Sequence, residues 1–341
     1  MTASPEKSAA SPWFPFKIAP SFADRVWGTS DLRPWFDIAV KEKLIGEAWL
    51  TGDQCTVASG AFSGQRLDAL FAAHGEALVG PAALKQLSSG STGANSPSPL
   101  LIKVIFAREK LSVQVHPDDE MAHKYGEPRG KTECWYVLES TPGAQVACGL
   151  KPGVTLDDLK AGIADGTLEN SLKMLELARG ELIYVDAGTV HAIWPGAILL
   201  ETQQNCDLTY RMYDYGRGRE LHIEKSLEAV KFSTHAGIVN PVKRPGGIIL
   251  VDGAYFRIER IETAAGLSNA SLRNPAAEPE PGLAYLFAAA GSARITAPGF
   301  DAIEFSKGGL VAVPARSPEF VIEDRGSLEL IRITPHWPGA A

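Results

Sequence analysis

One strand-and-turn pattern occurs twice in the chain, and it limits the folds open to this sequence. The first copy reads "GELIYVDAGTVH" over residues 180–191, and the second reads "GGLVAVPARSPE" over residues 308–319. In each copy a glycine precedes five mainly apolar residues, a three-residue turn, two more residues and a polar side chain, His191 or Glu319. Short apolar runs that end in turn residues are typical of β-strands. A repeat of this kind predicts two related β-rich domains.

Other short runs of β-forming residues surround both copies, and Gly, Pro and Asp separate them. The runs in the earlier part of the chain are "LLIKVIF", "LSVQVH", "CWYVLE" and "AILLETQQ". Those after Pro241 are "GIILVDG", "FRIERIE", "LAYLFAAAG" and "SLELIRIT". This pattern predicts antiparallel sheets, arranged as a barrel or a sandwich, in two domains that meet near residue 241.

Two segments have helical character instead. Apolar residues recur at helical spacing from Leu67 to Leu84, which predicts one or two short helices over about 66–85. The segment 155–179 begins with a Thr cap, has acids early and ends before Gly180, so we expect a helical insertion there. The Ser-, Gly- and Pro-rich stretch 87–99 predicts a loop, and the polar residues 1–13 predict a flexible tail.

The charge and composition disfavour several classes of partner. The formal net charge is -7 and the pI is near 5.6, so we expect neither nucleic acid nor an anionic membrane as a partner. No apolar run reaches the ~20 residues that span a bilayer, and the N-terminal residues do not resemble a secretion signal. The four cysteines lack C-x-x-C spacing, which favours reduced thiols and a cytoplasmic location. An anionic small substrate would need cations close to its site.

Four polar residues on strand-like runs form a candidate metal site. Gln114 and His116 lie two residues apart, so they project to one face of a strand. Glu133 and His191 occupy other runs, and a barrel interior can bring such positions together. This mixed nitrogen and oxygen set suits zinc, manganese or iron rather than calcium. Each residue taken alone is more often an ordinary structural residue.

Two cationic residues lie close to this set. Lys131 should share the face of Glu133, since the two are separated by one residue. Arg211, in "LTYRMYD", is expected to be buried and to need an anion; a structural ion pair with Asp207, Asp214 or Glu201 is the alternative. These patterns leave two classes of function open: a metalloenzyme acting on an anionic substrate, or a non-catalytic barrel that binds a small molecule.

The motifs resemble those of known families. The unit that ends at His191 is similar to the second signature of the cupins, and Gln114-x-His116 is similar to their first signature with glutamine in place of histidine. Taken in order, "SVQVHPDD", "GKTECWYV", "GTVHAI" and "ETQQNCDLTYRMYD" closely resemble the type I phosphomannose isomerases, particularly the shorter bacterial form. "VWGTSDL" and "IGEAWLTG" match that family's N-terminal signatures, so the resemblance runs from about Phe14 to His222.

The resemblance implies a fold and a division of the chain. It implies an all-β-dominated protein of two cupin (jelly-roll) barrels with a helical insertion. Residues 14–240 would form the catalytic metal-binding domain after the tail at 1–13. Residues 241–341 would form a cupin-like domain without metal ligands, because Arg316 and Glu319 replace the glycine and histidine of the first repeat.

The resemblance also implies site residues. One zinc ion per chain would be held by Gln114, His116, Glu133 and His191. The implied active-site residues are Arg211, Lys131 and Glu201, of which Glu201 and Lys131 are both candidate bases. Lys103 and Ser112 match positions near a substrate phosphate, and Trp27 and Glu47 match pocket residues. Gly130 and Ile193 depart from the family pattern, since some members carry a histidine and an aromatic residue there.

The implied reaction is the reversible interconversion of D-mannose 6-phosphate and D-fructose 6-phosphate through a cis-enediol(ate). Two alternatives remain: a cupin that binds a sugar phosphate without turnover, and an isomerase of another aldose phosphate. Sequence does not fix epimer preference, because one hydroxyl orientation is worth only a few hydrogen bonds. We expect a monomer or homodimer whose partner is a sugar-phosphate substrate.

Overall fold

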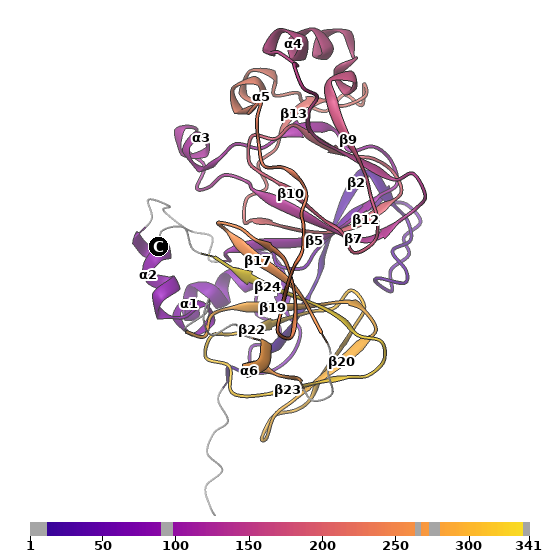
Figure 1. Ribbon diagram of the computed structural model, residues 1–341. Helices are drawn as coiled ribbons and strands as arrows, with labels where there is room; N and C mark the ends of the chain where they lie inside the picture. The colour runs from indigo at the N-terminus through magenta and orange to yellow at the C-terminus, as the bar shows by residue number, and fades with distance from the viewer. Residues whose placement is uncertain (1–11, 90–97, 263–266, 273–279, 337–341) are drawn as a thin grey trace, which may run out of the picture. The chain divides into compact units, whose positions relative to one another are not determined.

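The computed structural model describes residues 12–89, 98–262, 267–272 and 280–336. Nearly all of the tail predicted at 1–13, and most of the loop predicted at 87–99, lie outside these residues. The chain divides into two compact units (Figure 1). Unit 1 comprises Met1–Ala19, Gln54–Ser89 and Val242–Ala341, and unit 2 comprises Pro20–Asp53 and Gly90–Pro241.

The change between units at residues 241 and 242 falls where the sequence predicted a boundary, but two earlier segments belong to unit 1 rather than to a continuous domain 14–240. Strand β1 (Phe16–Ala19) pairs with β22 (Leu310–Val313), which lies almost 300 residues later along the chain. The helices predicted over 66–85 are present as α1 (Leu67–Val79) and α2 (Pro81–Ser89), and Leu78 of α1 accepts a hydrogen bond from Ala315 N. Pairing between distant segments, rather than chain order, decides this division.

Unit 2 is built from two antiparallel sheets. The seven-stranded sheet has the order β14 (Gly237–Ile238), β10 (Leu182–Val185), β7 (Glu133–Ser140), β12 (Ala197–Gln204), β5 (Leu100–Ala107), β3 (Ile45–Trp49) and β2 (Ser21–Thr29). The five-stranded sheet has the order β13 (Tyr210–Tyr213), β6 (Val113–Val115), β11 (His191–Ile193), β8 (Gln145–Leu150) and β9 (Leu172–Glu176). One apolar cluster contains side chains from both sheets, among them Trp135, Leu199, Val146 and Ile193.

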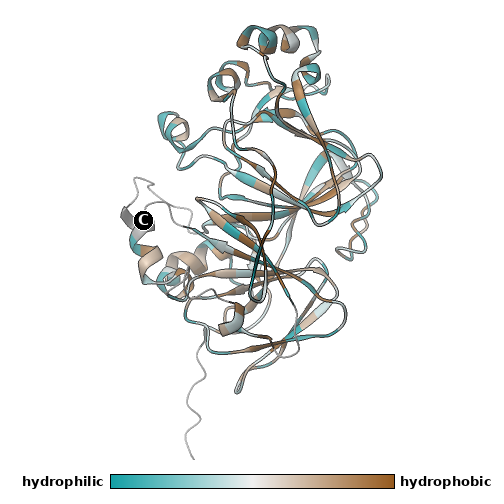
Figure 2. Cartoon of the chain, viewed as in Figure 1, coloured by the Kyte–Doolittle hydropathy of each residue, from teal (hydrophilic) through white to brown (hydrophobic). Residues whose placement is uncertain are grey.

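The five-stranded sheet has two different faces because side chains alternate along each strand. Val113, Val115 and Met212 pack on its outer face with Leu159 of α4 (Leu156–Asp165) and Ala229 of α5 (Ile223–Ala229). The polar residues that alternate with them, including Gln114, therefore point to the inner face. In Figure 2 the two helices alternate between brown and teal, as expected for helices that bury one side.

The helical insertion predicted over 155–179 is only partly correct. Thr155 caps α4 through a capping box with Asp158, as the sequence indicated. The helix ends at Asp165, because Gly166 adopts a left-handed conformation with φ 71°. A short 3₁₀ turn (Leu168–Ser171) and the strand β9 follow, and β9 pairs with β8. Among the described residues no helix combines the length and apolar character needed to cross a membrane.

Unit 1 repeats the strand order of unit 2. Its larger sheet runs β22, β19 (Ala284–Ala290), β24 (Glu329–Pro335), β17 (Phe256–Ile261), β16 (Gly247–Asp252) and β15 (Val242–Arg244), with β1 and β4 (Thr56–Val57) beyond β22. The corresponding order in unit 2 is β10, β7, β12, β5, β3 and β2. The smaller sheet contains β18 (Leu267–Ser268), β23 (Val321–Asp324), β20 (Ser292–Thr296) and β21 (Ile303–Ser306).

The repeat seen in the sequence is confirmed by matching hydrogen bonds. Gly180 N donates to Val137 O at 2.9 Å, and Gly308 N donates to Ala288 O at 2.9 Å. Both acceptor strands shift register just beyond this point, after Val137 in one unit and after Ala288 in the other. Since the named strand pairs are antiparallel, the prediction of a mainly antiparallel β protein is confirmed.

Candidate metal centre and active site

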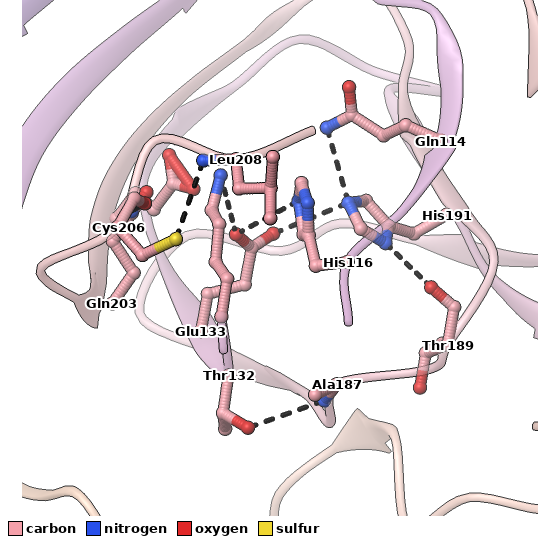
Figure 3. Close-up of polar contacts among 12 residues, drawn as sticks. Gln114, His116, Thr132, Glu133, Ala187, Thr189, His191, Gln203, Cys206 and Leu208 are labelled. Carbon is pink, nitrogen blue, oxygen red and sulfur yellow. Dashed lines mark hydrogen bonds and ion pairs between the residues drawn. The ribbon is translucent and has the colours of Figure 1, made fainter. Parts of the chain in front are cut away.

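Three buried side chains of unit 2 point toward one another (Figure 3). The ligand atoms of His116, Glu133 and His191 all lie within 4.8 Å of each other. Nε2 of His116 is 3.5 Å from one oxygen of Glu133, and Nε2 of His191 is 3.5 Å from the other. Each residue is only 1% exposed. No second group of three His, Cys, Asp or Glu side chains is arranged in this way in the part of the chain that the structure describes.

Strand register builds one wall of this site. Gln114 on β6 lies directly opposite Arg211 on β13 and His191 on β11. Directly opposite residues project to the same face of a sheet, so these three side chains form a row on the inner face. His116 lies two residues beyond Gln114 and extends that row. The predicted shared face of Gln114 and His116 is consistent with this register.

The other wall comes from the seven-stranded sheet. Glu201 on β12 lies opposite both Trp135 on β7 and Lys103 on β5. Glu133 shares the face of Trp135 two residues earlier, and Lys131 Nζ lies 3.3 Å from the Glu133 carboxylate. Lys131 is only 3% exposed and lies on the side of Glu133, as expected for two residues that share a strand face.

The two histidines are neutral. Burial lowers the pKa of His116 well below its usual value, and burial lowers the pKa of His191 to about 4. Nδ1 of His191 lies 2.8 Å from the carbonyl oxygen of Thr189, which can only accept, so this nitrogen carries the proton. Nε2 of His191 therefore directs its lone pair toward Glu133, as in metal-ligating histidines.

Several buried atoms of this cluster lack hydrogen-bond partners among the described residues. They are both ring nitrogens of His116 and both carboxylate oxygens of Glu133. Lys131 lies at ion-pair distance from Glu133, but a buried carboxylate that accepts no hydrogen bond from these residues is still costly. Two neutral imidazoles and one carboxylate around a common point match the ligand types of zinc and similar divalent metals. These residues therefore fit a metal ion.

Gln114 can complete the set after a small change. Its Nε2 lies 3.2 Å from His191 Nε2, while its Oε1 accepts from Ser112 Oγ at 3.3 Å. A half turn of the amide exchanges the two atoms, since oxygen and nitrogen occupy nearly equivalent positions. The oxygen would then face the same point as the imidazoles.

A chain of buried ion pairs lies beside the cluster. Lys103 Nζ is 3.3 Å from Glu201 and 3.4 Å from Glu47. Burial raises the pKa of Glu201 to about 7, with Lys103 opposing the rise and Glu133 adding to it. Burial alone would lower the pKa of Lys103, but Glu201 and Glu47 together raise it above its usual value. Lys103 is therefore a charged residue held between two carboxylates.

One cavity in unit 2 collects most of the predicted site residues. Nine of the eleven line it, and the remaining two, His116 and His191, contact Glu133 beside it. The nine are Trp27, Glu47, Lys103, Ser112, Gln114, Lys131, Glu133, Glu201 and Arg211.

Four polar lining residues were not among the predicted site residues: Arg25, Asp207, Thr209 and Arg219. Arg25 could have been found, because it alternates with Trp27 on β2. Arg219 carries no such signal, since it lies in the glycine-containing loop "YGRGRE" outside any strand.

The structural ion pair considered for Arg211 is not observed. Among the described residues Arg211 makes no ion pair; its Nη1 donates to the carbonyl oxygen of Glu220 at 2.8 Å. Asp214 instead accepts from Arg219, and Glu201 pairs with Lys103. That alternative is therefore wrong, and Arg211 remains open to an anion in the cavity.

Gly130 is explained by a close backbone contact. A Cβ atom at this position would lie 2.4 Å from the carbonyl carbon of Asp118 and 2.6 Å from Asp119 N. Any side chain here would force the backbone to move. The glycine that departs from longer members of the family is thus required by the local path of the chain.

Comparisons with known proteins point to one family. Residues 16–141 match a family model described as the catalytic domain of type I phosphomannose isomerase. The chain is 32% identical over 327 residues to the probable mannose-6-phosphate isomerase GmuF of Bacillus subtilis, covering 91% of this chain and 96% of that protein. It is 36% identical over 229 residues to mannose-6-phosphate isomerase ManA of Bacillus subtilis, covering 64% and 68%.

A solved structure gives the same result. The crystal structure of the mannose 6-phosphate isomerase from Bacillus subtilis superposes with a TM-score of 0.79 and 28% identity, covering 94% of this chain and 99% of that one. A second crystal structure, a putative mannosephosphate isomerase from Archaeoglobus fulgidus, has a TM-score of 0.75 at 20% identity and shares the fold. The chain belongs to the type I phosphomannose isomerase family.

Proposed function

We propose that the protein is a zinc-dependent isomerase that interconverts D-mannose 6-phosphate and D-fructose 6-phosphate. One observation carries the proposal: two neutral histidines and a carboxylate that accepts no hydrogen bond from the described residues converge beside a cavity that also holds Glu201, Lys131 and Arg211. A protein that only bound a sugar phosphate would not need candidate proton-transfer groups next to a metal site.

Gln114, His116, Glu133 and His191 would hold the zinc ion. When bound, zinc supplies a Lewis acid that can polarise sugar oxygens. The ligand types favour zinc over calcium, because imidazole is a common zinc ligand and calcium prefers an all-oxygen set.

Glu201 is our candidate for the base that moves a proton between the first two carbons. Its carboxylate faces the cavity, and it is 3% exposed, so water does not compete strongly for it. Lys131 is the other candidate, and its contact with Glu133 makes it better suited to donating a proton to a sugar oxygen. Arg211 would place a fixed positive charge beside the enediolate.

We also propose that each unit is a cupin-type barrel, with unit 2 catalytic and unit 1 a copy without a metal. The matching strand orders and glycine hydrogen bonds support this. The absence of a second His, Cys, Asp and Glu cluster among the described residues supports the difference between the units.

A coupled assay of mannose 6-phosphate conversion tests the function. Turnover should be present in the zinc-loaded protein, disappear after chelation and return with zinc. Failure of the zinc-loaded protein to convert mannose 6-phosphate would reject the proposal. Turnover of a different aldose phosphate would then favour another isomerase, and binding without turnover would favour a sugar-phosphate-binding protein.

A further inference from the structure

The cavity of unit 2 holds five cationic side chains against four carboxylates. Three of the cations contact carboxylates of the cavity lining. Lys103 lies between Glu47 and Glu201, Arg25 Nη2 is 2.6 Å from Glu47, and Lys131 contacts Glu133. Arg219 pairs instead with Asp214, which does not line the cavity, and Arg211 makes no ion pair among the described residues.

Arg211 lines the cavity and has N–H groups that make no hydrogen bond to the described residues. Its Nε is buried and has no hydrogen-bond partner among the described residues, and only its Nη1 is used, by the carbonyl oxygen of Glu220. Arg219 lines the same cavity, and burial, together with the positive charge of Arg219, lowers the pKa of Arg211. Two guanidinium groups that line one cavity favour an anionic ligand there.

The turn before Arg219 and the contact with Asp214 fix the position of Arg219. Tyr215, Gly216 and Gly218 have positive φ angles of 55°, 73° and 76°, so the chain turns sharply and returns Arg219 to Asp214. The Asp214 carboxylate accepts from Arg219 Nε at 2.8 Å and from Nη2 at 2.5 Å. Asp214 is 3% exposed, which makes this a fixed attachment. A guanidinium has five N–H donors, and Asp214 takes two of them.

We propose that Arg219 binds the phosphate group of the substrate and that Asp214 positions Arg219, while Arg211 faces the reacting carbons of the same molecule. The proposal rests on the proposed isomerase function and names the part of the site that recognises phosphate. Arginine forks match phosphate oxygens in a bidentate geometry. Lys103, which the sequence placed near the phosphate, is less suited, because it is 2% exposed and two carboxylates already neutralise it.

The test compares Arg219→Gln with the unaltered protein, both zinc-loaded, by titration calorimetry. The probes are D-mannitol 1-phosphate and D-mannitol, which have no carbonyl group and cannot be isomerised. Loss of charge-assisted hydrogen bonds should weaken binding of the phosphate about 10- to 100-fold. Binding of mannitol should be the same in both proteins. In the coupled assay KM for mannose 6-phosphate should rise by a similar factor while kcat changes little.

Arg33→Gln is the matched control, because Arg33 makes a similar two-point contact with Asp31 but does not line the cavity. Its binding of the phosphate should be unchanged. Arg219→Gln leaves the buried Asp214 without its counter-ion, which could prevent folding. In that case the double variant Asp214→Asn/Arg219→Gln, which removes both charges, is tested in place of the single variant. Equal affinity of a folded variant and the unaltered protein for mannitol 1-phosphate would overturn the proposal.

Two further outcomes separate this proposal from the proposed function. If the unaltered protein binds mannitol 1-phosphate no better than mannitol, there is no phosphate site and the proposal for Arg219 is overturned. If it binds the phosphate through Arg219 but does not turn over mannose 6-phosphate, the proposed isomerase function fails and the assignment of Arg219 stands.

Discussion

The two units place opposite arrangements of charge at equivalent positions. Val137 and Ala288 make the same hydrogen bonds to their glycines, so counting back along β7 and β19 aligns Trp135 with Leu286. The cross-strand partner of Trp135 is Glu201, and that of Leu286 is Arg332. One strand further, the partner of Glu201 is Lys103 and the partner of Arg332 is Glu259. The acid and the base have changed places.

The comparison shows that the same strand order can hold a candidate metal site in one unit and a fully paired ion triad in the other. In unit 1, Glu259 is fully buried and both of its oxygens are used, by Arg244 at 2.5 Å and Arg332 at 2.8 Å. The position that aligns with Glu133 is Ala284. At these positions unit 1 therefore has a satisfied ion triad and an alanine in place of Glu133, whereas unit 2 keeps Glu133 without a hydrogen-bond partner among the described residues.

The variant with the largest expected effect removes the carboxylate of Glu133. Glu133→Gln should reduce bound zinc from one per chain to near zero, because an amide is a weaker ligand, and should lower turnover about 10⁴-fold. Metal analysis by mass spectrometry and the coupled assay measure the two effects. Glu259→Gln is the matched control, since it changes the buried glutamate of unit 1 and should leave the zinc content of the folded protein unaltered. Normal zinc content in Glu133→Gln would remove Glu133 from the metal site.

Glu201→Gln should separate chemistry from metal binding. Glu201 lies beside the cluster, so the variant should retain zinc while kcat falls about 10³-fold, the usual loss for a general base. The measurement is kcat at saturating mannose 6-phosphate together with zinc content on the same sample. Full turnover in the zinc-loaded variant would exclude Glu201 as the base and leave Lys131 as the candidate.

The unit 1 triad should matter for stability and not for catalysis. Arg332→Met leaves Glu259 with one partner in a buried site, which should lower the free energy of unfolding by about 3–5 kcal/mol. Urea unfolding measures this, and kcat below the transition should be unchanged. Arg294→Met is the control: its ion pair with Glu304 is long and exposed, so the expected change is under about 0.5 kcal/mol. Equal losses in the two variants would contradict a stabilising role for the triad.

Much of the site could be predicted from the sequence, because alternation along strands is a local property. The shared face of Gln114 and His116, and that of Lys131 and Glu133, follow from spacing alone. That Glu133 and His191 join them depended on the family motifs, since spacing cannot tell which strands become neighbours.

Other features depend on pairing across long distances and were missed. "LKMLE" at 172–176 contains good helix formers, yet it forms β9 because β8 offers an open edge. The assignment of 54–89 to unit 1 and the return of Arg219 onto Asp214 likewise follow from contacts between segments that no local pattern indicates.

The smallest expected effect is an acid sensitivity of the unit 2 interior. Burial would raise the pKa of Glu47, but Lys103, Arg25 and a hydrogen bond from Trp49 outweigh it and lower the pKa to about 2. Because this folded-state pKa lies below the unfolded value of 4.5, the stabilisation is present above about pH 4.5 and is lost as the pH falls toward 2.

The shift corresponds to about 3 kcal/mol in the free energy of unfolding. Urea unfolding of the unaltered protein and of Glu47→Gln between pH 7 and pH 3 measures it. The difference in unfolding free energy between the two proteins should shrink as the pH falls, and protonation of the metal ligands cancels because it affects both. A difference that stays constant with pH would mean that Glu47 is not held by its cations. The charge network around Lys103 would then stabilise unit 2 less than the closed triad stabilises unit 1.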